Sequence, residues 1–213
     1  MGLRVVVEVA PKRTFASALD WPGWSRGAKT EEAAIEALLA YAPRYAAVAR
    51  RAKVAFPARH SVEIVERLDG GGSTEFGVPG AAAAAESDPL STAELARLIT
   101  LLEAAWATFD AAARQARGVK LRLGPRGGGR QLPKVVEHVH DADGGYLHQL
   151  GTRASGVADL RAAFVEALTA RATDRPLPNP NRVRKPWSPR YAARRSAWHA
   201  LDHAWEIEDR ASG

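Results

Sequence analysis

Two histidines at helical spacing are the clearest candidates for chemistry in this sequence. His199 and His203 are four residues apart, so in a helix both imidazoles project from one face and can bind the same ion. A third, His138, lies in another helical pattern that opens near Pro133. If the two helices are neighbours, three neutral imidazoles can coordinate one divalent cation and leave positions open for water or substrate, as in catalytic sites. The alternative for the pair alone is a surface or interfacial role.

Arginines close to these histidines are candidates for binding an anionic substrate. Arg195 is one turn before His199, and a guanidinium can bind a carboxylate through two hydrogen bonds. The alternative for Arg195 is an ion pair with acids of neighbouring helices. Arg126 and Arg130 belong to the sequence GPRGGGR, residues 124–130, whose backbone N–H groups could also bind an anion. The alternative for this segment is a connecting loop without a ligand.

Two carboxylates next to His203 are candidates for orienting an imidazole or a metal-bound water. Asp202 comes directly before it, and Glu206 follows three residues later. The alternative for each is a solvated or ion-paired side chain on the helix surface.

Composition narrows the chemistry further. The 213 residues contain no Cys, which excludes disulfides, thiolate metal ligands and a cysteine nucleophile and fits a reducing cytoplasm. No apolar stretch is long enough to span a bilayer, and no cleavage site follows the short apolar run at the N-terminus. We therefore expect a cytoplasmic protein without a membrane partner.

The positive charge is concentrated in two segments. Residues 114–134 carry seven cations and no acid, and residues 171–195 carry eight cations and one acid, Asp174. Basic segments permit nucleic-acid binding, but both are rich in Gly or Pro and hold few aromatic residues on which bases could stack. We therefore expect a small-molecule substrate and not nucleic acid, and the sequence is compatible with a homodimer.

Residues 91–213 have helical periodicity. Ser91 and Glu94 have the spacing of a capping box, which marks a helix start. Further helices are expected from about Pro133, over residues 157–172, and from about Pro189. Four amphipathic helices in succession predict an all-α up-down four-helix bundle, whose core can hold a site built from facing helices.

The N-terminal part predicts a small α+β domain, residues 1–68. Thr30 is a candidate N-cap of a helix that Pro43 ends or kinks. Patterns typical of strands occupy residues 3–9, 14–19 and 61–68.

Residues 69–90 contain clustered Gly and two Pro residues, which predict a linker without a regular element. The predicted fold class is thus a small α+β domain followed by an all-α bundle.

The helical part, residues 91–213, resembles the DinB-like superfamily of metal-binding bundles, which includes mycothiol-dependent maleylpyruvate isomerases and bacillithiol transferases. The order of elements, the stretch VVEHVHDAD and the stretch AWHALDHAWEIEDR carry this resemblance. Members place one metal ligand early in the second helix and two more, four residues apart, in the last helix. Carried over to this sequence, the ligands are His138, His199 and His203. The resemblance implies a divalent metal, zinc or nickel, and thiol transfer or hydrolysis.

The N-terminal part resembles the HicB-like antitoxin domain through ALDWPGWSRGAKTEEA, in which a strand, a Pro-Gly turn and a helix start follow one another.

Two functions therefore stay open. The favoured one is a metal-dependent enzyme that uses a low-molecular-weight thiol of the mycothiol type, or water, on a small anionic substrate. The alternative is a non-catalytic interaction module, in which the HicB-like part binds a partner and the metal is structural or absent.

Overall fold

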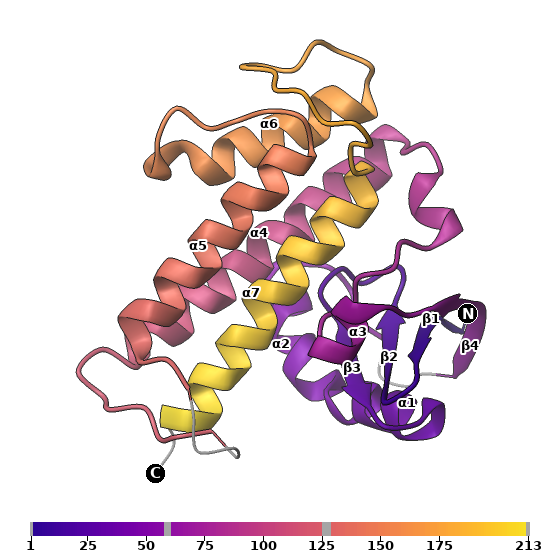
Figure 1. The fold of residues 1–213 in the computed structure, drawn as a ribbon, viewed down its shortest axis with the longest axis vertical. Helices are drawn as coiled ribbons and strands as arrows, with labels where there is room; N and C mark the ends of the chain where they lie inside the picture. Colours follow the sequence, from indigo (N-terminus) through magenta and orange to yellow (C-terminus); the bar gives the residue numbers. More distant parts are fainter. Residues whose placement is uncertain (1, 58–60, 125–128, 212–213) are drawn as a thin grey trace.

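The computed structural model describes residues 2–57, 61–124 and 129–211 (Figure 1). The strands are β1 (Leu3–Ala10), β2 (Arg13–Ala18), β3 (Ser25–Ala28) and β4 (Val62–Asp69). The helices are α1 (Glu31–Ala40), α2 (Ala42–Arg51), α3 (Gly72–Phe76), α4 (Thr92–Gln115), α5 (Leu132–Gln149), α6 (Leu160–Ala172) and α7 (Pro189–Ala211), with short 3-10 turns η1 (Ala84–Ser87) and η2 (Val157–Asp159). Among the described residues, no helix is long and apolar enough to cross a membrane.

β1 is an inner strand of a mixed four-stranded sheet with the order β3-β2-β1-β4. β2 runs antiparallel to β1, whereas β4 runs parallel to it after the chain has passed through α1 and α2. α1 begins at the predicted N-cap, since the Thr30 hydroxyl accepts a hydrogen bond from the Ala33 N–H. The helix packs against β2 and β3, and the Trp24 indole fixes it there by donating to the Leu38 carbonyl at 2.8 Å.

The segment between β4 and α4 is folded onto the sheet. The expectation of no regular element in residues 69–90 is wrong, because α3 and η1 lie there. Glu8, a buried carboxylate of β1, accepts hydrogen bonds from the backbone N–H groups of Gly80 (3.1 Å) and Ala81 (3.0 Å). These bonds satisfy the buried charge and hold the segment against the sheet. The division into units 1–68 and 91–213 stays a prediction.

The four helices that follow begin close to the predicted positions. α4 opens with the predicted capping box, in which Ser91 and Glu94 exchange hydrogen bonds. α5 has Pro133 in its first turn, where the missing N–H costs nothing. α6 and α7 begin at Leu160 and Pro189.

The predicted fold class, with its all-α up-down four-helix bundle, is nevertheless wrong, because α4 to α7 do not form a clear bundle. α6 has only 13 residues and lies across one end of the other three helices (Figure 1). α7 is buried on all sides from Tyr191 to Leu201, whereas a bundle helix leaves one face to solvent. Its side away from α5 packs on the N-terminal unit, where Phe15 and Trp198 meet edge-to-face at 6.3 Å.

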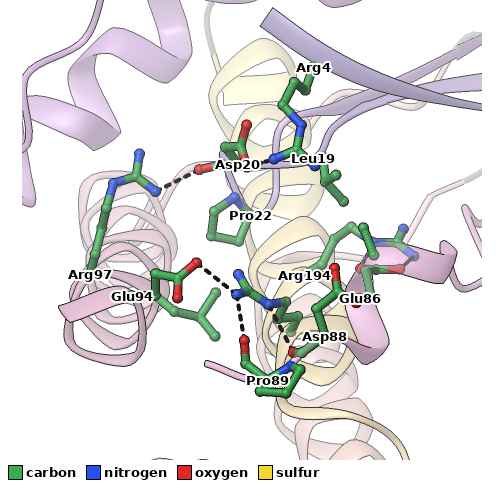
Figure 2. A pocket seen from close by; sticks show the side chains of 13 residues that line it. Arg4, Leu19, Asp20, Pro22, Glu86, Asp88, Pro89, Glu94, Arg97 and Arg194 are labelled. Carbon is green, nitrogen blue, oxygen red and sulfur yellow. Dashed lines mark hydrogen bonds and ion pairs between the residues drawn. The ribbon is translucent and has the colours of Figure 1, made fainter. Parts of the chain in front are cut away.

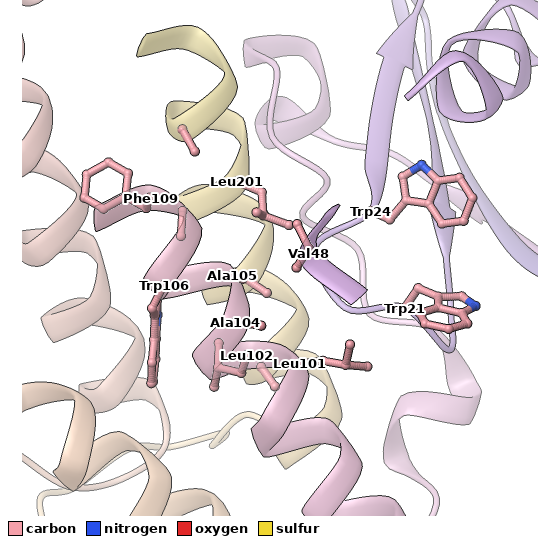
Figure 3. Packing of buried hydrophobic residues seen from close by; sticks show 14 of the residues in the cluster. Trp21, Trp24, Val48, Leu101, Leu102, Ala104, Ala105, Trp106, Phe109 and Leu201 are labelled. Atoms are coloured by element: carbon pink, nitrogen blue, oxygen red, sulfur yellow. The ribbon is translucent and has the colours of Figure 1, made fainter. Parts of the chain in front are cut away.

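The core is therefore shared by both halves of the chain. Figure 3 shows Leu201 of α7 beside Val48 of α2, with α4 side chains in the same buried cluster. The labelled members of this cluster are Trp21, Trp24, Val48, Leu101, Leu102, Ala104, Ala105, Trp106, Phe109 and Leu201. Burying such side chains contributes about 1.5–3 kcal/mol each, so the contact between the halves is a major part of the folding free energy.

A buried ion pair also joins α7 to η1, in the segment between β4 and α4. The Arg194 guanidinium of α7 donates to both carboxylate oxygens of Glu86, at 2.6 and 3.0 Å, and both side chains are buried. It donates as well to the Ala81 carbonyl at 2.7 Å. Beside this pair is a polar cavity of about 240 Å³ between the loop before β3, η1, α4 and α7 (Figure 2). In it Arg97 donates to the Asp20 carbonyl at 2.7 Å.

We predict that Arg194→Met costs about 3–5 kcal/mol of unfolding free energy, because it leaves the Glu86 carboxylate buried and unpaired. Urea unfolding at pH 7 measures this. The double variant Arg194→Met with Glu86→Gln should recover more than about 1 kcal/mol of the loss. Lys134→Met, which breaks the exposed pair with Glu137, should change stability by less than about 1 kcal/mol. A single variant as stable as the wild type would contradict the role of this pair.

Candidate metal centre

The three predicted histidines meet between α5 and α7. His138 comes from α5, and His199 and His203 from successive turns of α7. Their ligand atoms all lie within 4.8 Å of one another. The Nε2 atoms of His138 and His199 are 3.1 Å apart, and the ring centroids of His138 and His203 are 5.1 Å apart. The structure thus brings together the donor set that the sequence predicted.

The spacing of these nitrogens fits a metal ion. Two imidazole nitrogens, each about 2.0–2.1 Å from a tetrahedral zinc ion, are about 3.3 Å from each other. The His138 and His199 nitrogens, at 3.1 Å, are close to this value. The cluster groups three histidines from two helices and, among the described residues, no fourth ligand. Three protein ligands with one open position are the arrangement of catalytic zinc sites.

The surroundings keep two of the imidazoles neutral, as metal ligation requires. Burial, helped by the neighbouring His203 and His138, lowers the pKa of His199 to about 2. Burial, followed by the nearby His203 and Arg130, also lowers the pKa of His138. Both rings therefore carry free lone pairs at pH 7. The Nδ1 of His199 is buried without a hydrogen-bond partner among the described residues, so its Nε2 faces the cluster.

Glu206 orients the third histidine. Its carboxylate is 2.7 Å from Nδ1 of His203, and this contact, together with Arg210, holds the pKa of Glu206 below its usual value. The ionised carboxylate accepts a hydrogen bond from the Nδ1–H group, which leaves the Nε2 lone pair for an ion. Arg210 anchors Glu206 at 2.6 Å. Asp202, the other candidate, instead pairs with Arg26 of β3 at 2.9 Å.

The three predicted substrate-binding arginines lie in different surroundings: Arg195 is buried, Arg130 is exposed, and Arg126 is not among the described residues. Arg195 is buried one turn from His199, and its charge is among the causes of the lowered His199 pKa. Arg130 is exposed and contributes to the same effect on His138 and His199. Both cations thus act on the histidine cluster electrostatically. Arg126 lies outside the described residues.

Comparison with protein-family models, with curated proteins and with solved structures finds no match.

Sequence reasoning missed a buried carboxylate in the same helix pair. Asp143 of α5 accepts a hydrogen bond from the Ser196 hydroxyl of α7 at 2.6 Å, and Ser196 accepts one from the Trp106 indole at 2.9 Å. The second carboxylate oxygen of Asp143 is buried without a partner among the described residues. Burial raises the pKa of Asp143 to about 7. The available signal was its place in the stripe Val135, Val139, Asp143, Leu147, all buried.

We predict that the full-length protein, purified without a His tag, binds one Zn²⁺ per chain and that His199→Ala or His203→Ala abolishes this stoichiometric binding. Two remaining imidazoles cannot hold zinc as three do. Elemental analysis after gel filtration measures the ratio, and circular dichroism checks that the helices persist. His148→Ala, which removes an exposed histidine of α5, should keep full occupancy. Full zinc content in the double variant His199→Ala with His203→Ala would sink the assignment.

A second prediction concerns Asp143. Its folded-state pKa of about 7 lies above its usual value of 3.8, so the folded state holds a proton that the unfolded chain releases. The wild type should therefore lose stability as the pH rises from about 4 to 7, by at most about 1.4 kcal/mol per pH unit from this group. Between pH 4 and 7, the unfolding free energy of Asp143→Asn, measured with urea, should rise relative to that of the wild type. Asp141→Asn, which alters an exposed carboxylate of α5, should run parallel to the wild type. A pH-independent difference for Asp143→Asn would refute the assignment.

Proposed function

We propose that the protein is a divalent-metal-dependent enzyme whose metal, zinc or nickel, is held by His138, His199 and His203. The observation that carries the proposal is the convergence of three imidazole ligand atoms within 4.8 Å. Two of these imidazoles have pKa values lowered by burial, and the third is oriented by Glu206. Hydrogen-bonded carboxylates that fix a ligating histidine accompany functional metal sites.

The reaction class follows from the donor set. When bound by three neutral histidines, a divalent ion lowers the pKa of a coordinated thiol or water and supplies a nucleophile near neutral pH. The chain contains no Cys, so a thiol must come from a small molecule. We therefore propose thiol transfer or hydrolysis as the activity. The resemblance to the DinB-like superfamily favours a low-molecular-weight thiol.

The residues around the cluster have separate tasks in this proposal. Glu206 keeps the Nδ1 proton of His203 in place, and Arg210 keeps Glu206 ionised and fixed. Arg195 and Arg130 give the cluster a positive potential that attracts an anionic substrate. Tyr146, whose ring centroid is 6.1 Å from that of His199, shields the site from one side. The protein thus supplies ligands, orientation and charge.

The decisive experiment asks whether the bound ion has a position open to a thiol. We expect the Co²⁺-loaded protein to develop thiolate-to-cobalt charge-transfer absorption when N-acetylcysteine is added, and not when N-acetylserine is added, because only the thiol can supply a thiolate ligand. His148→Ala should respond like the wild type, and His203→Ala should not retain cobalt.

A cobalt spectrum that responds neither to the thiol nor to a pH titration would mean a saturated site. That result would contradict an enzyme and favour the non-catalytic interaction module.

A further inference from the structure

Arg195 of α7 is a buried cation that forms no ion pair with any carboxylate of the described residues. The residue is only 8% exposed. Its Nη1 donates to the Tyr191 hydroxyl at 3.1 Å and its Nη2 to the Tyr146 hydroxyl at 3.4 Å. Its Nε is buried and donates to no acceptor in the described part of the chain. A guanidinium has five N–H groups, so these two hydrogen bonds leave most of its donors without a protein acceptor.

Two other buried arginines of α7 each pair with a carboxylate, which Arg195 does not do among the described residues. Arg194 pairs with Glu86, and Arg210 pairs with Glu206. Within residues 2–57, 61–124 and 129–211, no ion pair of Arg195 is formed. A buried charge that lacks a counter-ion is strongly unfavourable, so this position calls for an anion from outside the chain.

Four aromatic rings surround the guanidinium, and we call them the Arg195 cage. Their centroids lie at the following distances from Cζ: Tyr146 at 5.4 Å, Trp187 at 5.6 Å, Tyr191 at 5.9 Å and Trp198 at 5.9 Å. Ring faces attract a cation, which explains how the chain tolerates the charge. Apart from the Tyr191 and Tyr146 hydroxyls, no acceptor in the described part of the chain takes the N–H groups of Arg195, and Nε has no partner there.

The Arg195 cage adjoins the histidine cluster. Tyr191, Arg195, His199 and His203 follow one another at intervals of four residues in α7, which places them along one face of the helix. Tyr146 contacts both sites, because its hydroxyl meets Arg195 and its ring packs 6.1 Å from that of His199. A group bound at Arg195 therefore lies beside the metal ligands.

A cavity borders the Arg195 cage. It has a volume of about 620 Å³, and Trp187 and Tyr191 line both the cavity and the cage. Arg171 and Lys185 also line it, and none of its described lining residues is acidic. The volume suits a small organic molecule, and the charges favour an anionic one.

We propose that the Arg195 cage binds the carboxylate of a small aromatic or apolar organic acid. A planar carboxylate can accept from Nε and one Nη of Arg195 at the same time. Its single negative charge balances the single buried cation, whereas a phosphate dianion would leave excess charge among apolar rings. The inference rests on the proposed function only in that this acid would be the substrate of the histidine cluster.

The test uses benzoate and the full-length protein after removal of metal with a chelator, so that it does not depend on metal binding. Titration followed by tryptophan fluorescence should show that the wild type binds benzoate at least about tenfold more tightly than neutral benzamide. Arg195→Met should weaken benzoate binding about tenfold or more, the loss of a charge-assisted pair. Arg117→Gln is the control, because it removes the same single positive charge at an exposed position. It should bind benzoate like the wild type.

Equal binding of benzoate by Arg195→Met and the wild type would overturn the inference, as would equal binding of benzamide and benzoate or tighter binding of inorganic phosphate. Without ligand, Arg195→Met should have a higher Tm, since it removes an unpaired buried cation; a lower Tm would point to a structural role and also overturn it. If Arg195→Met fails to fold, Arg195→Lys keeps the charge without the planar fork, and unchanged benzoate affinity in it counts against the inference. The zinc stoichiometry of the same variants, measured before the chelator is added, separates these results from failure of the metal site.

Discussion

The burial of α7 on every side is the constraint on which the rest of the structure depends. Its eleven residues from Tyr191 to Leu201 are all buried, so α4, α5, the N-terminal unit and the segment after β4 must all approach it closely. Small residues make this approach feasible, since Ala192, Ala193, Ala197 and Ala200 are all fully buried. Gly23, with φ of +92°, is placed so that a Cβ would come within 2.9 Å of the Ala197 backbone.

A helix buried on all sides also buries its polar side chains, and Arg194, Ser196 and His199 of α7 each contact a different partner. Arg194 finds Glu86, Ser196 finds Asp143 and Trp106, and His199 faces His138. Ser196 and His199, three residues apart, share the face of α7 toward α5, whereas Arg194 points toward η1. One helix therefore packs on the N-terminal unit, contributes to the helical core and carries two of the three clustered histidines.

Local signals predicted much of this arrangement. Ser91 with Glu94, Thr30 and Pro133 mark helix starts through their own hydrogen bonding, which depends on a few neighbouring residues. The four-residue spacing of His199 and His203 likewise fixes a shared face, and only the position of α5 was needed to add His138. The packing of α7 could not be predicted in this way. Its small and apolar residues fit burial by several partners, and long-range contacts alone decide which partners those are.

The position of α7 in the sequence has a consequence for synthesis on the ribosome. Chains emerge at about 5–20 residues per second, and α7 follows every element on which it packs. The sheet, α4 and α5 must therefore wait with their apolar faces uncovered until residues 189–211 have been made. Two of the three clustered histidines are also missing until then, since only His138 precedes α7. The packing around α7 and the grouping of all three histidines therefore arise only after this helix has been made.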